Sequence, residues 1–346
     1  MNGFERINNV LNGQATDVVP VMLHNFMSAA REGGMTMQQF RSSSENIAND
    51  FVDAARRYQL DGILTDVDTA LEAYALGAET HFGEDTPAKV IAPISNRIEE
   101  VIDSIDSEKI QQDKRIRIYL DAIQLIRKQV GGELFIRGNA DQGPFSLAAA
   151  VYGLTNMMMD LVNPEKEDII LQLIERCYEV HLTFHRMVKE SGADMTSFGD
   201  SMGSPELISP KMYKKFVEPF QKRLVQELAQ DGIQTVCHIC GKTDRILQPM
   251  SECQFSGVEI DYKTNLEDVQ KTMNGKSTVF GILDPSGVFC FGDETLVREK
   301  TLTVLNQFQG RGLVIGAGCA LPAETPSENI RMFVNTVRNY RIPAII

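Results

Sequence analysis

The residue pattern with the clearest chemical meaning is His238-Ile239-Cys240, an imidazole and a thiol two positions apart at the end of an apolar run. Because side chains alternate along a strand, His238 and Cys240 point to one face and Cys237 points to the other. A third candidate, Cys319, follows a distant apolar run, with glycines before it that let backbone and ion approach closely. One imidazole and two thiolates are typical of a catalytic zinc site that keeps its fourth position open.

The same segment allows two other interpretations. Cys237 and Cys240 form a C-x-x-C pair, which is typical of redox proteins. A thioredoxin-like motif, however, opens a helix directly after its strand, and here the two thiols face opposite sides of a strand end. The plainer alternative is that His238 and Cys240 are core residues and that Cys319 is an unreactive thiol. Only a fold that brings positions 238 and 319 together favours metal binding.

The elements that must position these residues are short apolar runs that alternate with longer amphipathic stretches. This alternation favours a parallel sheet with crossover helices. The eight runs are Val18–Leu23, Gly62–Thr65, Glu133–Arg137, Met195–Phe198, Ile233–His238, Gly257–Ile260, Ser277–Ile282 and Gly312–Ile315. Eight is the number that a (β/α)8 TIM barrel needs, although a doubly wound sheet can use a similar count. We predict one barrel domain over residues 1–346, with helical additions before the first strand.

The active site of such a barrel lies at the C-terminal ends of its strands. The residues found there are His24, Asp66, Asn139 with Asp141, Asp200, His238 with Cys240, Asp261, Asp284 and Cys319. Turns are rich in Asp and Asn in any protein, so the His and Cys members carry more weight.

These positions give a candidate site with three groups of residues. The predicted metal ligands are His238, Cys240 and Cys319, with Asp261 as the candidate labile fourth ligand. The predicted catalytic residues are Asp261, Asp200 and Asn139, and the predicted substrate-binding residues are His24, Asp66, Asp141, Gln142 and Asp284. A separate pair, His181 and His185, has a spacing that can bind metal on a helix. We interpret that pair as part of a solvated helix face and assign it no role.

Composition narrows the class of protein. The chain has 346 residues, of which 43% are hydrophobic and 23% charged, as is typical of globular proteins. The net charge is −13 and no basic run occurs, so we expect no nucleic-acid partner. No stretch approaches ~18 uninterrupted apolar residues, so we expect no membrane span. The first nine residues lack the apolar region of a signal peptide. Six cysteines are too few for a disulfide scaffold, and we expect a cytoplasmic protein with free thiols.

Longer motifs resemble the uroporphyrinogen decarboxylase-like superfamily over nearly the whole chain. The matching segments are Leu11–Pro20 (LNGQATDVVP), Glu72–Gly77 (EAYALG), Gly143–Ala148 (GPFSLA), Ile208–Tyr213 (ISPKMY), His238–Gly241 (HICG) and Thr325–Ile330 (TPSENI). Their order and spacing agree with that superfamily. The resemblance implies a (β/α)8 barrel for this chain.

The superfamily contains two chemistries. Its decarboxylases share an arginine-rich N-terminal loop that grips propionate groups, whereas the matching segment here, Val21–Ser28 (VMLHNFMS), contains no arginine. Without arginines, an octa-anionic porphyrinogen would be poorly held. The cobalamin-dependent methyltransferases resemble this chain in the H-x-C pair and the distant Cys319, and some members have an acidic ligand near Asp261. The methyltransferase branch is therefore favoured, and within it the methylcobamide:coenzyme M methyltransferases.

This resemblance implies a zinc ion and a cobalamin carried by a small corrinoid protein. A methyl group would pass between that corrinoid protein and a small thiol or O-methyl substrate, oriented by Asn139, Asp141, Gln142 and Asp200. Two alternatives remain open. One is a metal-free tetrapyrrole decarboxylase, and the other is a corrinoid- or tetrapyrrole-binding chaperone without activity. The sequence also leaves open the methyl donor or acceptor and the oligomeric state, a homodimer included.

Overall fold

Eight parallel strands form one sheet in the computed structural model, which describes residues 1–344. In their order within the sheet the strands are β1 (Met22–Leu23), β2 (Gly62–Thr65), β5 (Phe135–Gln142), β6 (Met195–Gly199), β7 (Thr235–Ile239), β8 (Gly257–Ile260), β9 (Thr278–Leu283) and β10 (Leu313–Ala317). A parallel bridge between Val21 and Ile315 joins the first strand to the last and closes the sheet. The predicted (β/α)8 TIM barrel is confirmed.

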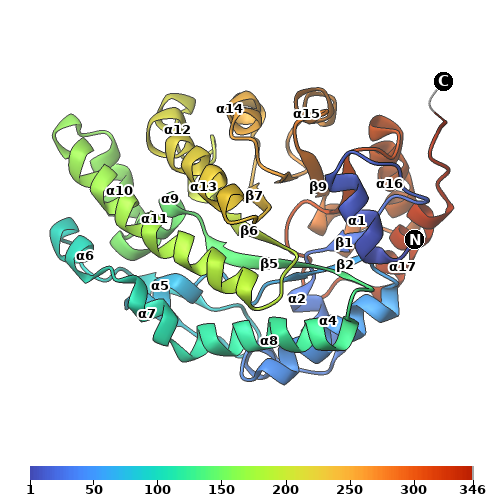
Figure 1. The fold of residues 1–346 in the computed structure, drawn as a ribbon, viewed down its shortest axis with the longest axis horizontal. Helices are drawn as coiled ribbons and strands as arrows, with labels where there is room; N and C mark the ends of the chain where they lie inside the picture. Colours follow the sequence, from blue (N-terminus) through green and yellow to red (C-terminus); the bar gives the residue numbers. More distant parts are fainter. Residues whose placement is uncertain (345–346) are drawn as a thin grey trace.

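Helices form a ring outside the strands (Figure 1). The ring helices are α4 (Ser44–Tyr58), α8 (Lys114–Val130), α11 (Glu167–Glu190), α13 (Glu218–Gln230), α14 (Leu247–Glu252), α15 (Leu266–Met273), α16 (Glu294–Phe308) and α17 (Ser327–Asn339). In α4, the Ser43 side chain caps the first turn, and buried residues such as Ile47 and Phe51 recur at helical spacing. Within residues 1–344, no helix combines the length and apolarity that a bilayer crossing requires.

The alternation of side chains along the strands divides the core into two layers. Val236 of β7 belongs to an inner cluster within the barrel, whereas its neighbour Cys237 belongs to the outer cluster beneath the helices. Helix α1 (Gly3–Leu11) adds Ile7 and Val10 to the inner cluster and thereby closes the N-terminal end of the barrel. The helical addition expected before the first strand and the outward direction of Cys237 are both confirmed.

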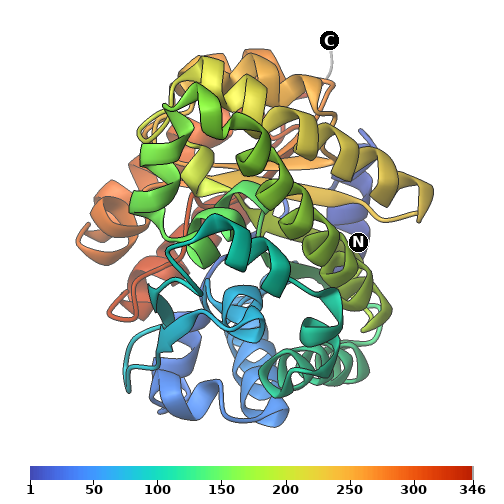
Figure 2. The same ribbon diagram turned by 90° about the vertical axis from the view of Figure 1, so that its left-hand side faces the viewer.

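Additional elements surround the opposite end, where the strands end and the crossover helices begin. They are α2 (Phe26–Glu32), α3 (Met37–Phe40), α5 (Leu71–Leu76), the antiparallel hairpin of β3 (Glu79–His81) and β4 (Lys89–Ala92), α6 (Ile98–Ser104), α7 (Ser107–Gln112), α9 (Pro144–Tyr152), α10 (Leu154–Leu161) and α12 (Pro210–Phe216). Figure 2 looks onto this end, with the added helices in teal and green at the front. We call this end the barrel mouth.

Two strands differ from the expected bounds. The strand expected over Val18–Leu23 is reduced to β1, because Pro20 has no N–H to contribute to the ladder. The strand expected to end at Arg137 continues to Gln142, so Asn139, Asp141 and Gln142 lie inside β5 rather than beyond it. A register shift between Asn139 and Gln142 marks a bulge, in which Asp141 has φ +55°. The prediction that residues 1–346 form a single domain stays a prediction.

Candidate metal centre

Three side chains that are far apart in the sequence meet at the barrel mouth. His238 is the fourth residue of β7, Cys240 directly follows that strand, and Cys319 lies two residues beyond β10. The Nε2 atom of His238 lies 2.9 Å from Sγ of Cys240, and this sulfur lies 3.7 Å from Sγ of Cys319. The ligand atoms of all three residues lie within 4.8 Å of one another. The three residues that the sequence predicts as ligands are therefore close enough to hold one ion.

Hydrogen bonds orient these donors before any ion is bound. The ring of His238 donates from Nδ1 to the backbone carbonyl oxygen of Glu259, 3.1 Å away, which turns Nε2 toward the thiols. Metal-binding histidines are commonly anchored through their second nitrogen in this way. The backbone N–H of Cys240 donates to Oγ of Ser201, 3.1 Å away. One nitrogen and two sulfurs so arranged fit zinc and do not fit magnesium or calcium, which prefer oxygen ligands.

The two thiols differ in acidity because they lie against each other. The hydrogen bond from Cys319, aided by the nearby imidazole of His238, lowers the pKa of Cys240 to about 3 although burial opposes this. The same contact raises the pKa of Cys319, because a second thiolate would be repelled by the first. Burial lowers the pKa of His238, but Cys240 and Glu259 outweigh it and raise that pKa to about 10. The pair thus carries a thiolate, the form of cysteine that binds a metal.

A glycine directly before Cys319 allows the chain to reach this position. A Cβ atom on Gly318 would lie 2.6 Å from the carbonyl oxygen of Ile260 on β8. The N–H of Gly318 also donates to the carbonyl oxygen of Leu283, at the end of β9, over 2.7 Å. The segment is therefore wedged against two neighbouring strand ends, and only glycine fits without displacement.

A buried carboxylate, Glu259 of β8, connects the metal centre with the rest of the mouth. Its Oε1 atom lies 3.6 Å from Nδ1 of His238 and 3.7 Å from Nδ1 of His24. Its other oxygen pairs with the guanidinium of Arg137, which belongs to β5. Burial raises the pKa of Glu259, but Arg137 and the two imidazoles outweigh it and hold that pKa well below its usual range.

Sequence reasoning missed both Arg137 and Glu259. The available signal was a charged residue inside each of two short apolar strands, because a charge at such a position is rarely fully buried unless it is paired. The sequence does not show that the two strands face each other across the barrel.

Three residues predicted to contact substrate or take part in catalysis form a hydrogen-bonded chain along the neighbouring strands β1, β2 and β5 at the mouth. Nε2 of His24 lies 2.7 Å from Oδ2 of Asp66, and the amide of Asn139 donates to Oδ1 of Asp66 over 3.1 Å. Burial lowers the pKa of His24, but Asp66 and Glu259 outweigh it and raise that pKa to about 9. His24 is therefore a cation at neutral pH.

Two predicted catalytic residues, Asp261 and Asp200, have backbone and side-chain partners of their own. The two carboxylate oxygens of Asp261 accept hydrogen bonds from the backbone N–H groups of Gly241 and Lys263, at 2.8 and 3.0 Å. Asp261 is not part of the three-residue cluster. Asp200 is buried and accepts hydrogen bonds from Ser146. Their catalytic roles stay predictions.

The remaining predicted substrate residues lie in different surroundings. Asp284 caps the turn that follows β9, where its Oδ1 accepts from the N–H of Ser286 over 2.9 Å. Asp141 is buried and its Oδ2 accepts from the N–H of Glu72 over 2.9 Å. Gln142 lines a cavity at the mouth. Their contacts with substrate stay predictions.

The prediction that His181 and His185 lie on a solvated helix face is wrong. Both side chains are fully buried on α11, with their Nε2 atoms 3.0 Å apart. Nδ1 of His185 lies 2.7 Å from Oγ1 of Thr196, and Nδ1 of His181 lies 3.4 Å from a carboxylate oxygen of Glu72. The physical reason is that both residues lie on the face of α11 that packs against the barrel, where their rings contact Phe198 of β6 and their polar atoms find partners inside the protein.

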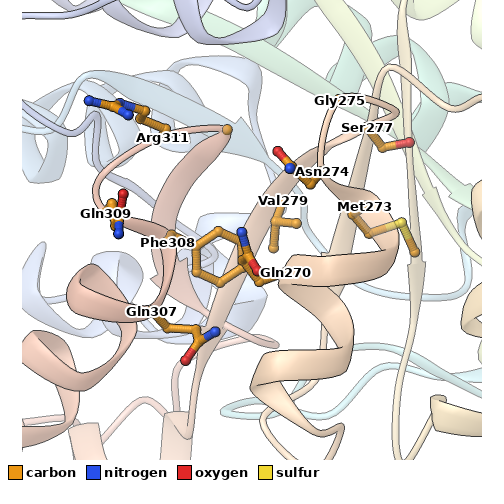
Figure 3. Close-up of a pocket in the computed structure, with 11 residues that line it drawn as sticks. Gln270, Met273, Asn274, Gly275, Ser277, Val279, Gln307, Phe308, Gln309 and Arg311 are labelled. Atoms are coloured by element: carbon orange, nitrogen blue, oxygen red, sulfur yellow. The ribbon is translucent and has the colours of Figure 1, made fainter. Parts of the chain in front are cut away.

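A separate cavity of about 440 Å³ lies at the other end of the barrel (Figure 3). Met273 and Asn274 border it just before β9, and Phe308 and Arg311 border it just before β10. Active sites in this fold lie at the opposite end of the barrel, where the strands finish. This cavity is therefore remote from Cys319, and we assign it no part in the candidate site.

Comparison with known proteins identifies the family of this chain. The family described as uroporphyrinogen decarboxylase (URO-D) matches residues 2–340. The chain belongs to the uroporphyrinogen decarboxylase family. This agrees with the resemblance that the sequence motifs indicate. Within the URO-D family, membership by itself does not separate decarboxylases from methyltransferases, so the individual relatives matter.

The chain is similar to members of both kinds within the URO-D family. Methylcobamide:CoM methyltransferase MtbA of Methanosarcina acetivorans is 29% identical over 68% of this chain and 68% of its own length. Uroporphyrinogen decarboxylase of Nostoc punctiforme is 24% identical over 96% of this chain and 95% of its own length. Among solved structures, a methyltransferase from Methanosarcina mazei superposes with a TM-score of 0.89 at 21% identity, covering 98% of both chains. The structural likeness shows that the whole fold is shared.

Proposed function

We propose that this chain is a zinc-dependent enzyme that moves a methyl group between a corrinoid protein and a small thiol or O-methyl substrate. The observation that carries the proposal is the convergence of His238, Cys240 and Cys319 within 4.8 Å of one another at the barrel mouth. The similarity to a methylcobamide:CoM methyltransferase supports it. The absence of arginine from Val21–Ser28 weighs against a decarboxylase that must hold a poly-anionic substrate.

The proposed chemistry divides between the ion and the chain. Zinc, when bound, supplies a Lewis acid that lowers the pKa of a thiol or polarises an ether oxygen. His238, Cys240 and Cys319 hold the ion, and the hydrogen bond from His238 to Glu259 fixes the ring that binds it. The two thiolates would balance the double positive charge of the ion, and the three protein ligands together would leave a fourth position for the substrate.

Other residues of the mouth orient the small substrate in this proposal. His24, held as a cation between Asp66 and Glu259, presents a fixed positive charge beside the metal centre. Asn139, bonded to Asp66, offers an amide whose position is set before substrate arrives. Preorganised polar groups of this kind lower the cost of aligning reactants. The corrinoid protein would approach the same mouth. Separately, all six cysteines are free thiols, which suits a protein of the reducing cytoplasm.

Metal content and methyl transfer test the proposal together. The purified full chain should contain close to one zinc ion, and it should demethylate methylcobalamin in the presence of a small thiol, or methylate cob(I)alamin from a methyl ether. A chelator should abolish this activity, and added zinc should restore it. The matched control is the Cys237→Ala variant, whose altered side chain faces the outer core. Decarboxylation of uroporphyrinogen at an unchanged rate in chelator, without methyl transfer, would replace the proposal with the decarboxylase.

A further inference from the structure

A pair of buried carboxyl groups fastens helix α5 to the end of strand β5. The backbone N–H of Glu72, in the first turn of α5, donates to Oδ2 of Asp141 over 2.9 Å. In return, the backbone N–H of Gln142 donates to Oε2 of Glu72 over 3.2 Å. Each side chain thus accepts a hydrogen bond from the backbone at or beside the other residue, and we call this reciprocal contact the Glu72–Asp141 clasp.

The clasp holds the bulge of β5. Asp141 has φ +55°, a left-handed conformation that is costly for residues other than glycine and persists where the surroundings impose it. The shifted segment of the strand begins at Asn139 and ends at Gln142. The amide of Asn139 donates to Asp66 at the barrel mouth. The clasp therefore determines the course of the chain directly after a residue that faces the mouth.

A chain of hydrogen bonds leads from Glu72 through two buried histidines of α11 to β6. Nδ1 of His181 lies 3.4 Å from Oε2 of Glu72, and its Nε2 lies 3.0 Å from Nε2 of His185. Nδ1 of His185 lies 2.7 Å from Oγ1 of Thr196, and this hydroxyl donates to the carbonyl oxygen of Gln234 over 3.3 Å. Burial lowers the pKa of both imidazoles, to about 3 for His181, so each ring is neutral and carries one N–H.

The single hydroxyl proton of Thr196 sets the direction of the whole chain. When Thr196 donates to Gln234, it accepts from the Nδ1–H of His185, so Nε2 of that ring accepts from the Nε2–H of His181. Nδ1 of His181 then has no proton, and Glu72 must supply one as a protonated acid. In the reverse direction, Nδ1 of His181 donates to Glu72, which is then a carboxylate.

The surroundings of Glu72 favour the protonated acid. The side chain is fully buried, and its Oε1 has no hydrogen-bond partner within residues 1–344. The titratable groups that act on it from β5 and α11 are Asp141, His181 and Cys177, and none of these three is a cation. Burial raises the pKa of Glu72 well above its usual range. A carboxylate here would be a buried charge without a counter-ion, which is costly.

We propose that Glu72 is a positioning residue of the barrel mouth: as a protonated acid it donates to Nδ1 of His181 and, through the clasp, fixes the bulge that sets the place of Asn139. The inference rests on the proposed function, in which the amide of Asn139 orients the small substrate. A neutral clasp holds the strand without adding a negative charge behind Asp66, the carboxylate that pairs with His24. Because Glu72 is fully buried, it acts through Asn139 and not on the substrate.

Imidazole NMR tests the protonation state without any methyl-transfer assay. The chain contains five histidines, so selective nitrogen-15 labelling of histidine resolves each ring. In the full chain at neutral pH we expect the Nε2–H tautomer at His181 and the Nδ1–H tautomer at His185, assigned with the His181→Gln and His185→Gln variants. Glu72→Gln should keep both tautomers, because its amide offers a donor and an acceptor. An Nδ1–H tautomer at His181 in the wild type would mean that Glu72 is a carboxylate and would overturn the inference.

Steady-state methyl transfer tests the positioning role. Glu72→Leu should lower kcat/KM at least about tenfold, since misplacing a group by ~1 Å can cost up to about 10²-fold in rate. Its zinc content should stay near one ion per chain, and Glu72→Gln should restore kcat/KM. Asp141→Gly relieves the left-handed conformation but removes the acceptor for the N–H of Glu72, so it should lose activity without losing stability. The matched control is Glu99→Leu, an exposed acid in the first turn of α6.

The outcomes separate this inference from the proposed function. Wild-type kcat/KM in Asp141→Gly would overturn the positioning role while methyl transfer itself stands, and this variant decides the matter if Glu72→Leu does not fold. Equal losses in Glu72→Gln and Glu72→Leu would overturn the protonated acid, because the amide replaces only that form. The expected tautomers in a wild type that transfers no methyl group would remove the proposed function and the positioning role together.

Discussion

Nδ1 of His238 donates a hydrogen bond to the backbone carbonyl oxygen of Glu259 over 3.1 Å, and the two residues are register partners on adjacent strands. The orientation of the imidazole is therefore set by the sheet rather than by a mobile loop. Cys240 and Cys319, in contrast, lie just beyond strand ends. The centre combines one rigid donor with two donors whose positions depend on the short segments that follow β7 and β10.

The first prediction concerns the distant thiol. Cys319→Ala should lower zinc content well below one ion per chain, because two protein ligands hold zinc more weakly than three. Elemental analysis after gel filtration measures this, with circular dichroism to verify folding. Cys237→Ala is the matched control and should keep its zinc, since this side chain belongs to the outer core. The reverse result, with metal lost only from the Cys237 variant, would revive the C-x-x-C interpretation.

A second prediction concerns the glycine before Cys319. Gly318→Ala should weaken zinc binding by about tenfold, or about 1.4 kcal/mol, because the new Cβ would lie 2.6 Å from the carbonyl oxygen of Ile260 and must displace the segment. Competition with a chromophoric chelator gives the affinity. Gly132→Ala is the control, because a Cβ there meets nothing within 4 Å. Equal affinities in the two variants would show that the segment adjusts without moving Cys319.

A third prediction concerns the buried pair of Arg137 and Glu259. Glu259→Leu should lower the free energy of unfolding by about 3 to 5 kcal/mol, because it leaves a buried guanidinium without its partner. The double variant Arg137→Leu with Glu259→Leu should recover part of this loss. Urea unfolding in chelator measures the protein without a contribution from metal. Additive losses in the double variant would show that the two charges do not depend on each other.

A fourth prediction concerns the pH dependence of stability. Burial lowers the pKa of His185 well below its usual value, so the folded chain keeps it neutral while the unfolded chain protonates near pH 6.5. Unfolding then takes up a proton below about pH 6.5, and stability falls as pH falls. Between pH 7.5 and 5.5 the wild type should lose about 1.4 kcal/mol more than His185→Gln.

Urea unfolding at the two pH values measures this difference. Burial raises the pKa of the nearby Glu72, which acts in the opposite direction as pH rises, but this contribution is common to both proteins and cancels in the comparison. Burial also lowers the pKa of His181 to about 3, so it should titrate in the same sense as His185. Parallel pH profiles of the wild type and the variant would mean that His185 is charged or solvated in the folded chain.

The sequence by itself determined the features that depend on local periodicity. Eight apolar runs predicted the strands of the barrel, and the two-residue period of a strand predicted that His238 and Cys237 face opposite sides. The fold class then placed Cys319 at the same end as Cys240, because parallel strands all end on one face. The predicted end of the third strand at Arg137 was wrong, because the strand continues to Gln142 through a bulge in which Asp141 has a positive φ.

Only the tertiary structure decided which residues meet across the barrel and which helix faces are covered. Arg137 and Glu259 lie on the third and sixth strands in sheet order, so their pairing exists only once the sheet has closed. His181 and His185 have the spacing of an exposed polar stripe, yet both are buried because they lie on the face of α11 that packs against β6 of the barrel. Periodicity is a property of a few neighbouring residues, whereas burial and pairing depend on closure and on what packs outside it.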